Sequence, residues 1–342
     1  PETLAPTSPH AHTDHLDVEA DETDTPYLDN APKLSHYQPW VGVVTNVEFD
    51  HADIYRDDIA YRFAFERFVN LVPGNGTLVV GWDTPVAREL AARSPAPVVS
   101  VGLQGDPVVR ATDPDTAGAR PRVGWRAVSL DDGPEGAAFT VLVDDTERGR
   151  VNLPASGAFN VRNALAAAAA AEAAGASWAG IVEGLRTFRS VRRRMEVRGE
   201  VAGVTVIDDF AHHPTAVAAT LDAARDRYPD RRIVGVFEPR SYTAQLRRFE
   251  SGYRSALGRA DRVWLSGLFR PERYDETTGL DPERLAADLT SDGTPAEHRD
   301  SVDSLVEAIV PSSSPGDVLV IMSNGGFGGI HQRVLDGLRG AP

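Results

Sequence analysis

The chain has no cysteine, only two methionines among its 342 residues, and a single lysine, Lys33. Without cysteine it can form no disulfide, thiolate metal site or cysteine nucleophile, which fits the cytoplasm, where we expect the protein. No apolar run approaches the roughly 20 residues that a membrane-spanning helix needs, so we expect no membrane insertion. The first residue is Pro1 rather than Met, and we therefore expect the true N-terminus to lie upstream.

An excess of positive charge is also lacking. The chain has 35 Lys and Arg against 50 Asp and Glu, for a net charge of −15. A general nucleic-acid binder needs a basic surface, so we expect no nucleic-acid partner. An acidic enzyme can still bind a nucleotide where it gathers arginines locally.

Several familiar motifs are missing. No G-x-G-x-x-G follows an expected strand, and the sequence contains no G-x-S-x-G elbow and no His/Cys zinc spacing. Dehydrogenase, hydrolase and zinc-enzyme functions therefore have little support. The phosphate-binding G-x-x-x-x-G-K-[ST] is missing too, and Lys33 lies outside any glycine-rich loop, so it cannot replace the lysine of that motif.

What is present is an alternation of strand and helix patterns. Residues 1–16, rich in Pro, Thr and His, are expected to be a tail or junction. Their three histidines could suggest a metal site, but the composition favours a flexible polar segment. We expect one domain over 17–188 and a second over 189–342. The expected strands are 40–46 (buried), 77–81, 97–102, 123–130, 138–143, 150–153, 232–237, 261–267 and 317–322, with a hairpin over 195–210 and helices at 59–72, 160–174, 178–185 and 214–227. Strands separated by helices predict two consecutive α/β domains with mostly parallel sheets.

Ligands bind beyond the carboxyl ends of parallel strands, so the residues just after each strand are the candidates. Carboxylates at 19–22, including Glu19, and the run 46–51, which ends in His51, would suit Mg²⁺, which takes one or two protein ligands. A solvated acidic loop with a helix-capping aspartate is the alternative, and spacing alone favours it.

The segment 157–163 opens a helix and carries Asn160 and Asn163 on one helical face. Asparagine at a helix start is usually a cap, and this interpretation is strong for Asn160. A second asparagine in the first turn adds little to capping, so Asn163 could present its amide to the edge of a base.

Four further segments are candidates: the first lies at the expected domain junction, and the other three follow expected strands. The arginines 192–194 are either a solvated run or a phosphate-collecting group. The run 207–214, Ile-Asp-Asp-Phe-Ala-His-His-Pro, places carboxylate and imidazole at one strand end, as ribose binding requires. The segments 238–243 and 322–329 follow the strands at 232–237 and 317–322, and the second is a glycine-rich turn that could offer backbone N–H groups to a peptide carboxylate.

Taken together and in order, these motifs resemble the Mur ligase family over nearly the whole chain after residue 16. The matching segments are EADETD (19–24), NVEFDHADIY (46–55), VPGNG (72–76), RRRMEVRGEVAGVTVIDDFAHHPTA (192–216), EPRS (238–241) and MSNGGFGGIHQ (322–332). The combination of VEFDHADI, DDFAHHPTA and MSNGGFGGIHQ is most similar to the members that act on a murein tripeptide. The members that add L-alanine share the first two in related forms.

The resemblance implies a partial central ATP-binding domain followed by a Rossmann-like C-terminal domain. It also implies ATP and Mg²⁺ as cofactors and, as reaction partners, UDP-N-acetylmuramate and the tripeptide L-alanyl-γ-D-glutamyl-meso-diaminopimelate. The muramate carboxylate would become an acyl phosphate, which the peptide amine then attacks.

The resemblance further implies roles for individual residues. Glu19 and His51 correspond to the magnesium-binding and catalytic residues, and His212 to a histidine near the nucleotide and the acyl phosphate. The residues implied to bind ATP are Asn160 and Asn163 at the adenine, Arg194 at the phosphates and Asp209 at the ribose. The residues implied to bind the incoming peptide are Arg240, Ser323, Asn324 and Phe327.

Nothing in the sequence matches the phosphate loop or the domain that holds the UDP sugar. We therefore expect this chain to be inactive by itself, as part of a longer ligase. Two alternatives remain open: an L-alanine-adding or other Mur-like ligase, and a non-catalytic protein that binds nucleotide or peptide.

Overall fold

The computed structural model describes residues 16–20, 23, 32–107, 122–133, 135–275 and 277–340. Contacts divide the chain into two compact units, and along the sequence the main division falls between Phe188 and Arg189. Two short segments, 132–137 and 154–159, belong with the second unit although they precede that division. The expected tail lies outside the described residues except for Leu16. Within the described residues no helix is long and apolar enough to cross a membrane.

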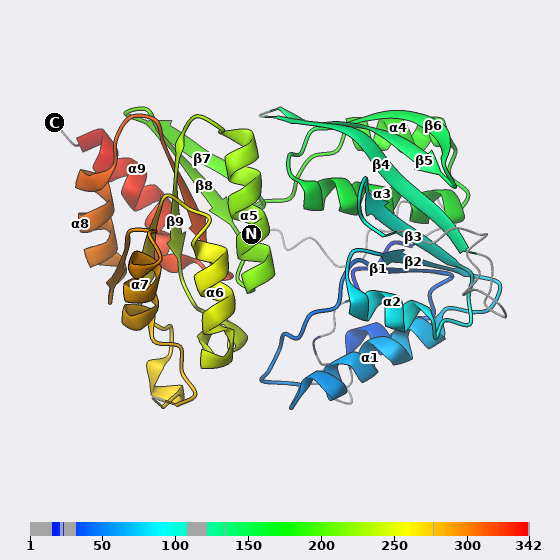
Figure 1. The fold of residues 1–342 in the computed structure, drawn as a ribbon, viewed down its shortest axis with the longest axis horizontal. Coiled ribbons are helices and arrows are strands. Elements are labelled where there is room, and N and C mark those ends of the chain that lie inside the picture. The colour runs from blue at the N-terminus through cyan, green and yellow to red at the C-terminus, as the bar shows by residue number, and fades with distance from the viewer. Residues whose placement is uncertain are drawn as a thin grey trace. The chain divides into compact units, whose positions relative to one another are not determined.

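The first unit is built on a six-stranded sheet in which the strands lie in sequence order, β1 to β6 (Figure 1). The first four strands pair in parallel, as expected. Very short turns join β4 to β5 and β5 to β6, and connections of this length only join antiparallel neighbours. The strands are β1 (Val41–Val44), β2 (Thr77–Gly81), β3 (Val98–Leu103), β4 (Arg122–Gly133), β5 (Gly136–Val143) and β6 (Thr146–Leu153).

Helix α1 (Asp58–Leu71) shows why the helices of this unit form where they do. Asp57 caps it by accepting a hydrogen bond from the backbone N–H of Ala60, and Pro73 follows soon after its end. Its buried residues recur at helical spacing, so one face packs inward; they are Tyr61, Ala64, Phe68 and Val69. The other helices of this unit are α2 (Pro85–Ala91), α3 (Ala158–Ala173) and α4 (Trp178–Arg186).

Strand β1 forms as predicted, but it is only partly buried, whereas the sequence predicted a buried strand. It is an edge strand of the described sheet, and the side chain of Val43 is 39% exposed while Val44 is buried. An apolar run indicates a strand but does not show how many of its faces are covered.

The second unit contains a six-stranded sheet in the order β11-β10-β9-β12-β8-β7. Neighbouring strands in this sheet pair in parallel, except for the antiparallel hairpin of β7 and β8. The strands are β7 (Glu196–Val201), β8 (Val204–Asp209), β9 (Arg232–Phe237), β10 (Arg262–Ser266), β11 (Ala296–Arg299) and β12 (Asp317–Met322).

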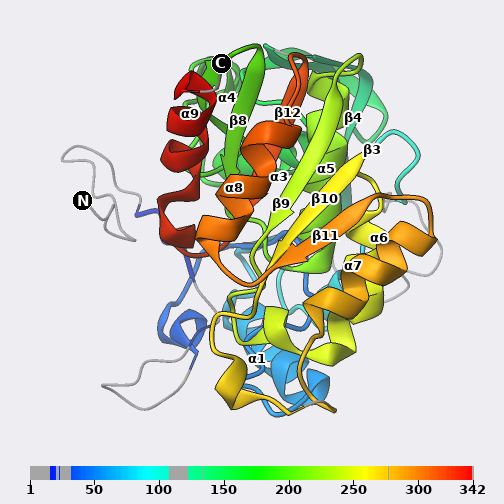
Figure 2. The same cartoon turned by 90° about the vertical axis from the view of Figure 1, so that its left-hand side faces the viewer.

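Two apolar clusters cover the two faces of this sheet, which makes the unit three-layered (Figure 2). Ile207 of β8 packs into one cluster and its neighbour Val206 into the other, because side chains alternate across a strand. Helices α5 (Pro214–Arg227), α6 (Glu250–Leu257) and α7 (Pro282–Ser291) supply the first cluster, and α8 (Val302–Ser312) and α9 (Ile330–Gly340) the second.

The hairpin expected over 195–210 is confirmed: β7 and β8 pair in antiparallel and turn at Ala202 and Gly203. Both residues have positive φ, 51° and 74°, as a tight two-residue hairpin turn requires. The predicted bounds of β9, β12 and α5 also match. Strand β11 was not predicted, since its sequence Ala-Glu-His-Arg is polar and only partly buried. The expected fold, two α/β domains with mostly parallel sheets, is confirmed.

Gly81 at the end of β2 allows a close backbone approach that positions the segment after β1. A Cβ at this position would lie 1.9 Å from the carbonyl oxygen of Thr45. We expect Gly81→Ala to destabilise the first unit by about 1–3 kcal/mol, because the overlap forces the backbone apart. Urea unfolding measures the effect.

Gly184 is the matched control, since it lies exposed in α4 and a Cβ there would meet nothing within 4 Å. Gly184→Ala should stabilise the unit by about 0.5–1 kcal/mol, the helix-propensity difference. Equal effects of the two substitutions would contradict the steric argument.

Candidate functional site

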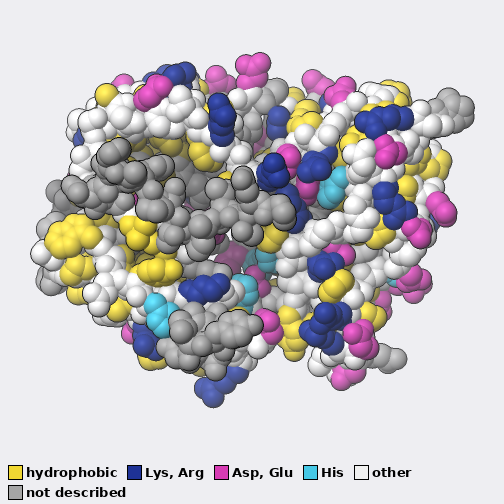
Figure 3. All heavy atoms as spheres, turned by 180° about the vertical axis from the view of Figure 1, so that it is seen from behind, with side chains coloured by type: hydrophobic (Ala, Val, Ile, Leu, Met, Phe, Trp, Pro, Cys, Tyr) yellow, Lys and Arg dark blue, Asp and Glu magenta, His cyan; other side chains and the backbone are white. Residues whose placement is uncertain are grey.

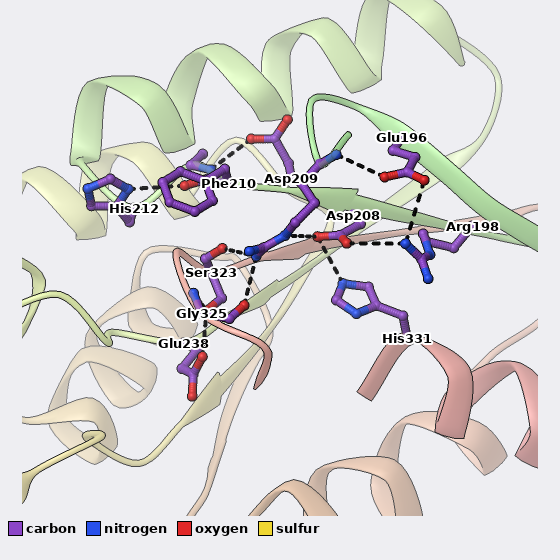
Figure 4. A network of polar contacts seen from close by, with 12 residues as sticks. Glu196, Arg198, Asp208, Asp209, Phe210, His212, Glu238, Ser323, Gly325 and His331 are labelled. Atoms are coloured by element: carbon purple, nitrogen blue, oxygen red, sulfur yellow. Dashed lines mark hydrogen bonds and ion pairs between the residues drawn. The ribbon is translucent and has the colours of Figure 1, made fainter. Parts of the chain in front are cut away.

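The candidate site of the second unit lies where β8, β12 and β9 end side by side (Figure 4). Backbone hydrogen bonds join the residues that follow these strands. The N–H of Ser323 donates to the carbonyl of Asp209 at 3.1 Å, and the N–H of Glu238 donates to Met322 at 3.1 Å. The parallel sheet thus brings three of the clusters predicted from sequence to one edge.

Ser323 and Glu238 hold the glycine-rich loop after β12. The hydroxyl of Ser323 donates to Oε2 of Glu238 at 2.5 Å and accepts from the N–H of Gly325 at 2.9 Å. Both residues are buried, with Ser323 1% and Glu238 7% exposed. The structure therefore uses the Ser323 hydroxyl to shape the loop, and its contact with a peptide stays a prediction.

The Arg240 side chain packs between the Phe269 ring and the glycine-rich loop after β12. Its guanidinium carbon is 3.6 Å from the ring centroid of Phe269, and one of its nitrogens is 3.5 Å from Oε1 of Glu238. A Cβ on Gly325 would lie 2.0 Å from Nε of Arg240, so in this conformation the Arg240 side chain packs directly on the Gly325 backbone. Gln245 supports the arrangement by donating to the carbonyl of Arg240 at 2.9 Å. A guanidinium fixed in this way is preorganised for a carboxylate.

The other two predicted peptide-binding residues differ from each other in burial. Asn324 Oδ1 is buried and accepts no hydrogen bond within the part of the chain that the structure describes. Phe327 is 0% exposed and packs in the apolar core against α8 and α9. Its backbone φ of 44° starts the turn into α9, so the structure places Phe327 as an anchor of the loop.

The two aspartates at the end of β8 have different surroundings. Asp208 lies 3.2 Å from Nε2 of His331 and accepts from Nε of Arg193 at 3.2 Å. Asp209 accepts from the N–H groups of Met195 and Ala211, each at 2.8 Å, and from the Thr220 hydroxyl at 3.1 Å.

These surroundings shift the two pKa values in opposite directions. Burial acts to raise the pKa of Asp208, but His331 and Arg193 outweigh it and hold the pKa below its usual range. Burial raises the pKa of Asp209, and its hydrogen bonds to Met195 and Ala211 only reduce that shift. Asp209 is 3% exposed, so its predicted contact with a ribose stays a prediction.

His212 and Arg194 both lie close to Phe210. Nδ1 of His212 is 3.0 Å from the carbonyl oxygen of Phe210, and the His212 carbonyl accepts from the Tyr253 hydroxyl at 2.5 Å. Arg194 is exposed, and its guanidinium carbon is 5.5 Å from the Phe210 ring centroid. An exposed guanidinium fits a phosphate contact.

In the first unit, His51 follows β1 in a left-handed conformation with a φ of 52°. The N–H of His51 donates to Oδ1 of Asp50 at 2.7 Å, and the His51 carbonyl accepts from the N–H groups of Ile54 and Tyr55. Glu19 is exposed, while residues 21 and 22 of the predicted acidic cluster lie outside the described residues. The described residues contain no group of three or more His, Asp or Glu that could hold a metal. Imidazole and carboxylate still fit a magnesium ion that takes most of its ligands from water and phosphate.

The interpretation of Asn160 as a helix cap is wrong. Helix α3 begins at Ala158, so Asn160 is its third residue and Gly157, with a φ of 102°, precedes the helix. Asn163 is exposed and Asn160 half-buried, and both lie in the first turns of α3. Sequence reasoning missed Arg162, which lies between them and donates to both carboxylate oxygens of Asp106 at 3.0 Å. This ion pair holds α3 against the loop after β3.

Charges of both signs are interspersed over the described part of the face drawn in Figure 3. The figure shows dark-blue Lys and Arg side chains next to magenta Asp and Glu side chains.

The opposite pKa shifts predict opposite pH effects for two matched variants. Asp208 has a lowered pKa, so its carboxylate stabilises the fold above its usual pKa of about 4 and that contribution is lost as the pH falls through the lowered value. The advantage of the wild type over Asp208→Asn should therefore shrink on acidification. Hydrogen exchange of β8 and β12 amides, corrected for intrinsic rates, measures this stability difference at each pH.

Asp209 has a raised pKa, so burial favours its protonated form and its contribution is lost as the pH rises through the raised value. The stability of the wild type relative to Asp209→Asn should improve on acidification. The same trend in both variants would contradict the assigned surroundings.

Comparison with known proteins identifies the fold's relatives. The family model of the Mur ligase middle domain matches residues 10–171, and that of the Mur ligase glutamate ligase domain matches residues 193–325. The chain is 37% identical over 330 residues to the UDP-N-acetylmuramate–L-alanyl-γ-D-glutamyl-meso-2,6-diaminoheptandioate ligase of Escherichia coli, covering 95% of this chain and 65% of that protein. It is 36% identical over 323 residues to the UDP-N-acetylmuramate–L-alanine ligase of Acidothermus cellulolyticus, covering 94% and 63%.

Solved structures of Mur-type ligases have the same fold as this chain. A murein peptide ligase from Psychrobacter arcticus superposes with a TM-score of 0.63 at 30% identity, over 94% of this chain and 62% of that chain. A UDP-N-acetylmuramate–alanine ligase from Thermotoga maritima, at 21% identity and a TM-score of 0.65, shares the fold. The chain thus spans about 65% of the length of the first curated relatives. With both of its units matched, the chain belongs to the Mur ligase family.

Proposed function

We propose that this chain is the middle and C-terminal part of an ATP-dependent ligase that joins UDP-N-acetylmuramate to L-alanyl-γ-D-glutamyl-meso-diaminopimelate. The muramate carboxylate takes the γ-phosphoryl group of ATP with release of ADP. The peptide amine then attacks the acyl phosphate, the amide bond forms, and inorganic phosphate leaves. In reactions of this type, positioning and charge neutralisation supply most of the rate.

The observation that carries the proposal is the preorganised loop after β12 together with Arg240. Arg240 offers a fixed guanidinium, and the neighbouring Asn324 offers a buried acceptor without a partner in the described chain. A tripeptide has carboxylates for the first and N–H groups for the second. The 37% identity to a ligase whose name specifies this tripeptide supports the same substrate.

Each unit carries residues that we propose contact ATP. Asn160 and Asn163 would contact the adenine, Arg194 the phosphates, and Asp209 the ribose, with His212 close to the reacting group. Glu19 and His51 would hold Mg²⁺, which would neutralise phosphate charge. The exposure of Arg194 and Asn163 supports their roles, whereas Asp209 would need its loop to open.

An L-alanine-adding ligase is the second candidate, because the chain is also 36% identical to such an enzyme. A protein that binds nucleotide or peptide without catalysis is the third. Both differ from the leading proposal in measurable ways.

The complete ligase, expressed with its upstream segment, tests the proposal. We expect phosphate release that requires ATP, Mg²⁺, UDP-N-acetylmuramate and the tripeptide together, with a new UDP-muramyl product by mass spectrometry. L-alanine in place of the tripeptide should give at least about 100-fold lower kcat/KM, since it cannot reach the same contacts. Faster turnover with L-alanine would favour the second candidate, and binding without turnover the third.

His51→Ala in the complete ligase should lower kcat by about 100-fold or more while leaving the Kd for ATP within about threefold, because its proposed metal acts on the reacting phosphate. His36→Ala is the matched control, since His36 is an exposed histidine of the same unit outside the proposed site. An unchanged kcat in His51→Ala would remove His51 from the catalytic residues.

A further inference from the structure

The second arginine of the run 192–194 makes contacts that no proposed substrate role explains. Nη2 of Arg193 donates to the carbonyl oxygens of Ser323 at 2.5 Å and of Gly325 at 2.7 Å. Its Nε donates to Oδ1 of Asp208 at 3.2 Å. One guanidinium therefore joins the segment before β7, the end of β8 and the glycine-rich loop after β12.

Arg193 is itself held in place. Its N–H donates to Oε2 of Glu196 at 2.8 Å, and its carbonyl accepts from the N–H of Phe210 at 2.9 Å. The Phe210 ring centroid lies 5.0 Å from the guanidinium carbon. The backbone at Arg193 has a φ of 61°, a conformation that costs free energy in a non-glycine residue and persists only where its surroundings determine it.

The two carbonyls that Arg193 binds flank Asn324, whose side-chain oxygen is buried and has no partner in the described chain. Three oxygens, two carbonyl and one carboxylate, converge on the guanidinium. Without the cation these oxygens would repel one another and the loop carbonyls would lose their donor. The loop would then move, and Asn324 would move with it.

We propose that Arg193 is a positioning residue that sets the conformation of the loop 323–326 and so orients Asn324 for the incoming peptide. This inference rests on the proposed function for the identity of the peptide. Arg193 and its neighbour Arg194 thereby have separate tasks, since Arg194 is exposed and Arg193 is directed to oxygens of the protein itself.

Arg193→Met removes all three donated hydrogen bonds and keeps an unbranched side chain. In the complete ligase we expect the KM for the tripeptide to rise about 10- to 100-fold, because a reacting group displaced by a fraction of an ångström loses its geometry. The KM for ATP should stay within about twofold. Arg193→Lys keeps the charge but not the planar set of donors, so its KM for the tripeptide should lie between those of the wild type and Arg193→Met.

Arg198→Met is the matched control. Arg198 approaches the same Asp208 at 3.9 Å and Glu196 at 3.5 Å, and both of these partners lie outside the loop. This variant should leave the tripeptide KM unchanged. An equal rise in the tripeptide KM of Arg193→Met and Arg198→Met would show that loss of any arginine from the ion-pair network raises it. That result would overturn the specific role of Arg193.

Hydrogen exchange of the loop amides in the chain described here gives a readout that needs no activity. The amides of residues 325–329 should exchange about tenfold faster in Arg193→Met and at the wild-type rate in Arg198→Met. Unchanged loop exchange in a folded Arg193→Met would overturn the inference, and Arg193→Lys serves the same comparison if the methionine variant does not fold. A wild-type ligase without tripeptide activity would instead refute the proposed function, while the exchange result would still decide whether Arg193 positions the loop.

Discussion

Two adjacent aspartates at the end of β8 hold the candidate site of the second unit together. Because side chains alternate across a strand, Asp208 faces Arg193 and His331 while Asp209 faces Met195, Ala211 and Thr220. Through Arg193, the first carboxylate fixes the loop after β12. The second fixes the segments before β7 and after β8. Buried carboxylates require such donors, so the surrounding loops cannot move independently of the strand.

This arrangement separates residues that shape the site from residues left to bind. Ser323 and Phe327 stabilise the fold: the Ser323 hydroxyl donates a hydrogen bond to Glu238, and Phe327 packs in the core. Arg240, which contacts Glu238 and Phe269, and Asn324 keep donor and acceptor capacity for a ligand. A ligase that works mainly by positioning needs this rigidity, since acyl transfer depends on the approach of two substrates.

The first unit contributes a different kind of framework. Its parallel strands end in loops that carry His51 and Asp106, and the bidentate pair of Arg162 with Asp106 ties α3 to the loop after β3. The asparagines on either side of Arg162 thereby take fixed directions in the first turns of the helix. Each unit thus presents candidate ligand-binding groups from elements secured by ion pairs, and each unit matches a domain of the Mur ligase family.

Sequence by itself determined the elements and the family. The bounds of β9, β12 and α5 follow from apolar runs and from Pro214 at a helix start, and the ordered motifs predict the Mur ligase family. Only the tertiary structure decided that Asn160 lies inside its helix, that Phe327 is core, and that Arg193 differs from Arg194. Local patterns carry propensity and periodicity, whereas the direction of a side chain depends on partners more than 100 residues away, as between Arg193 and Ser323.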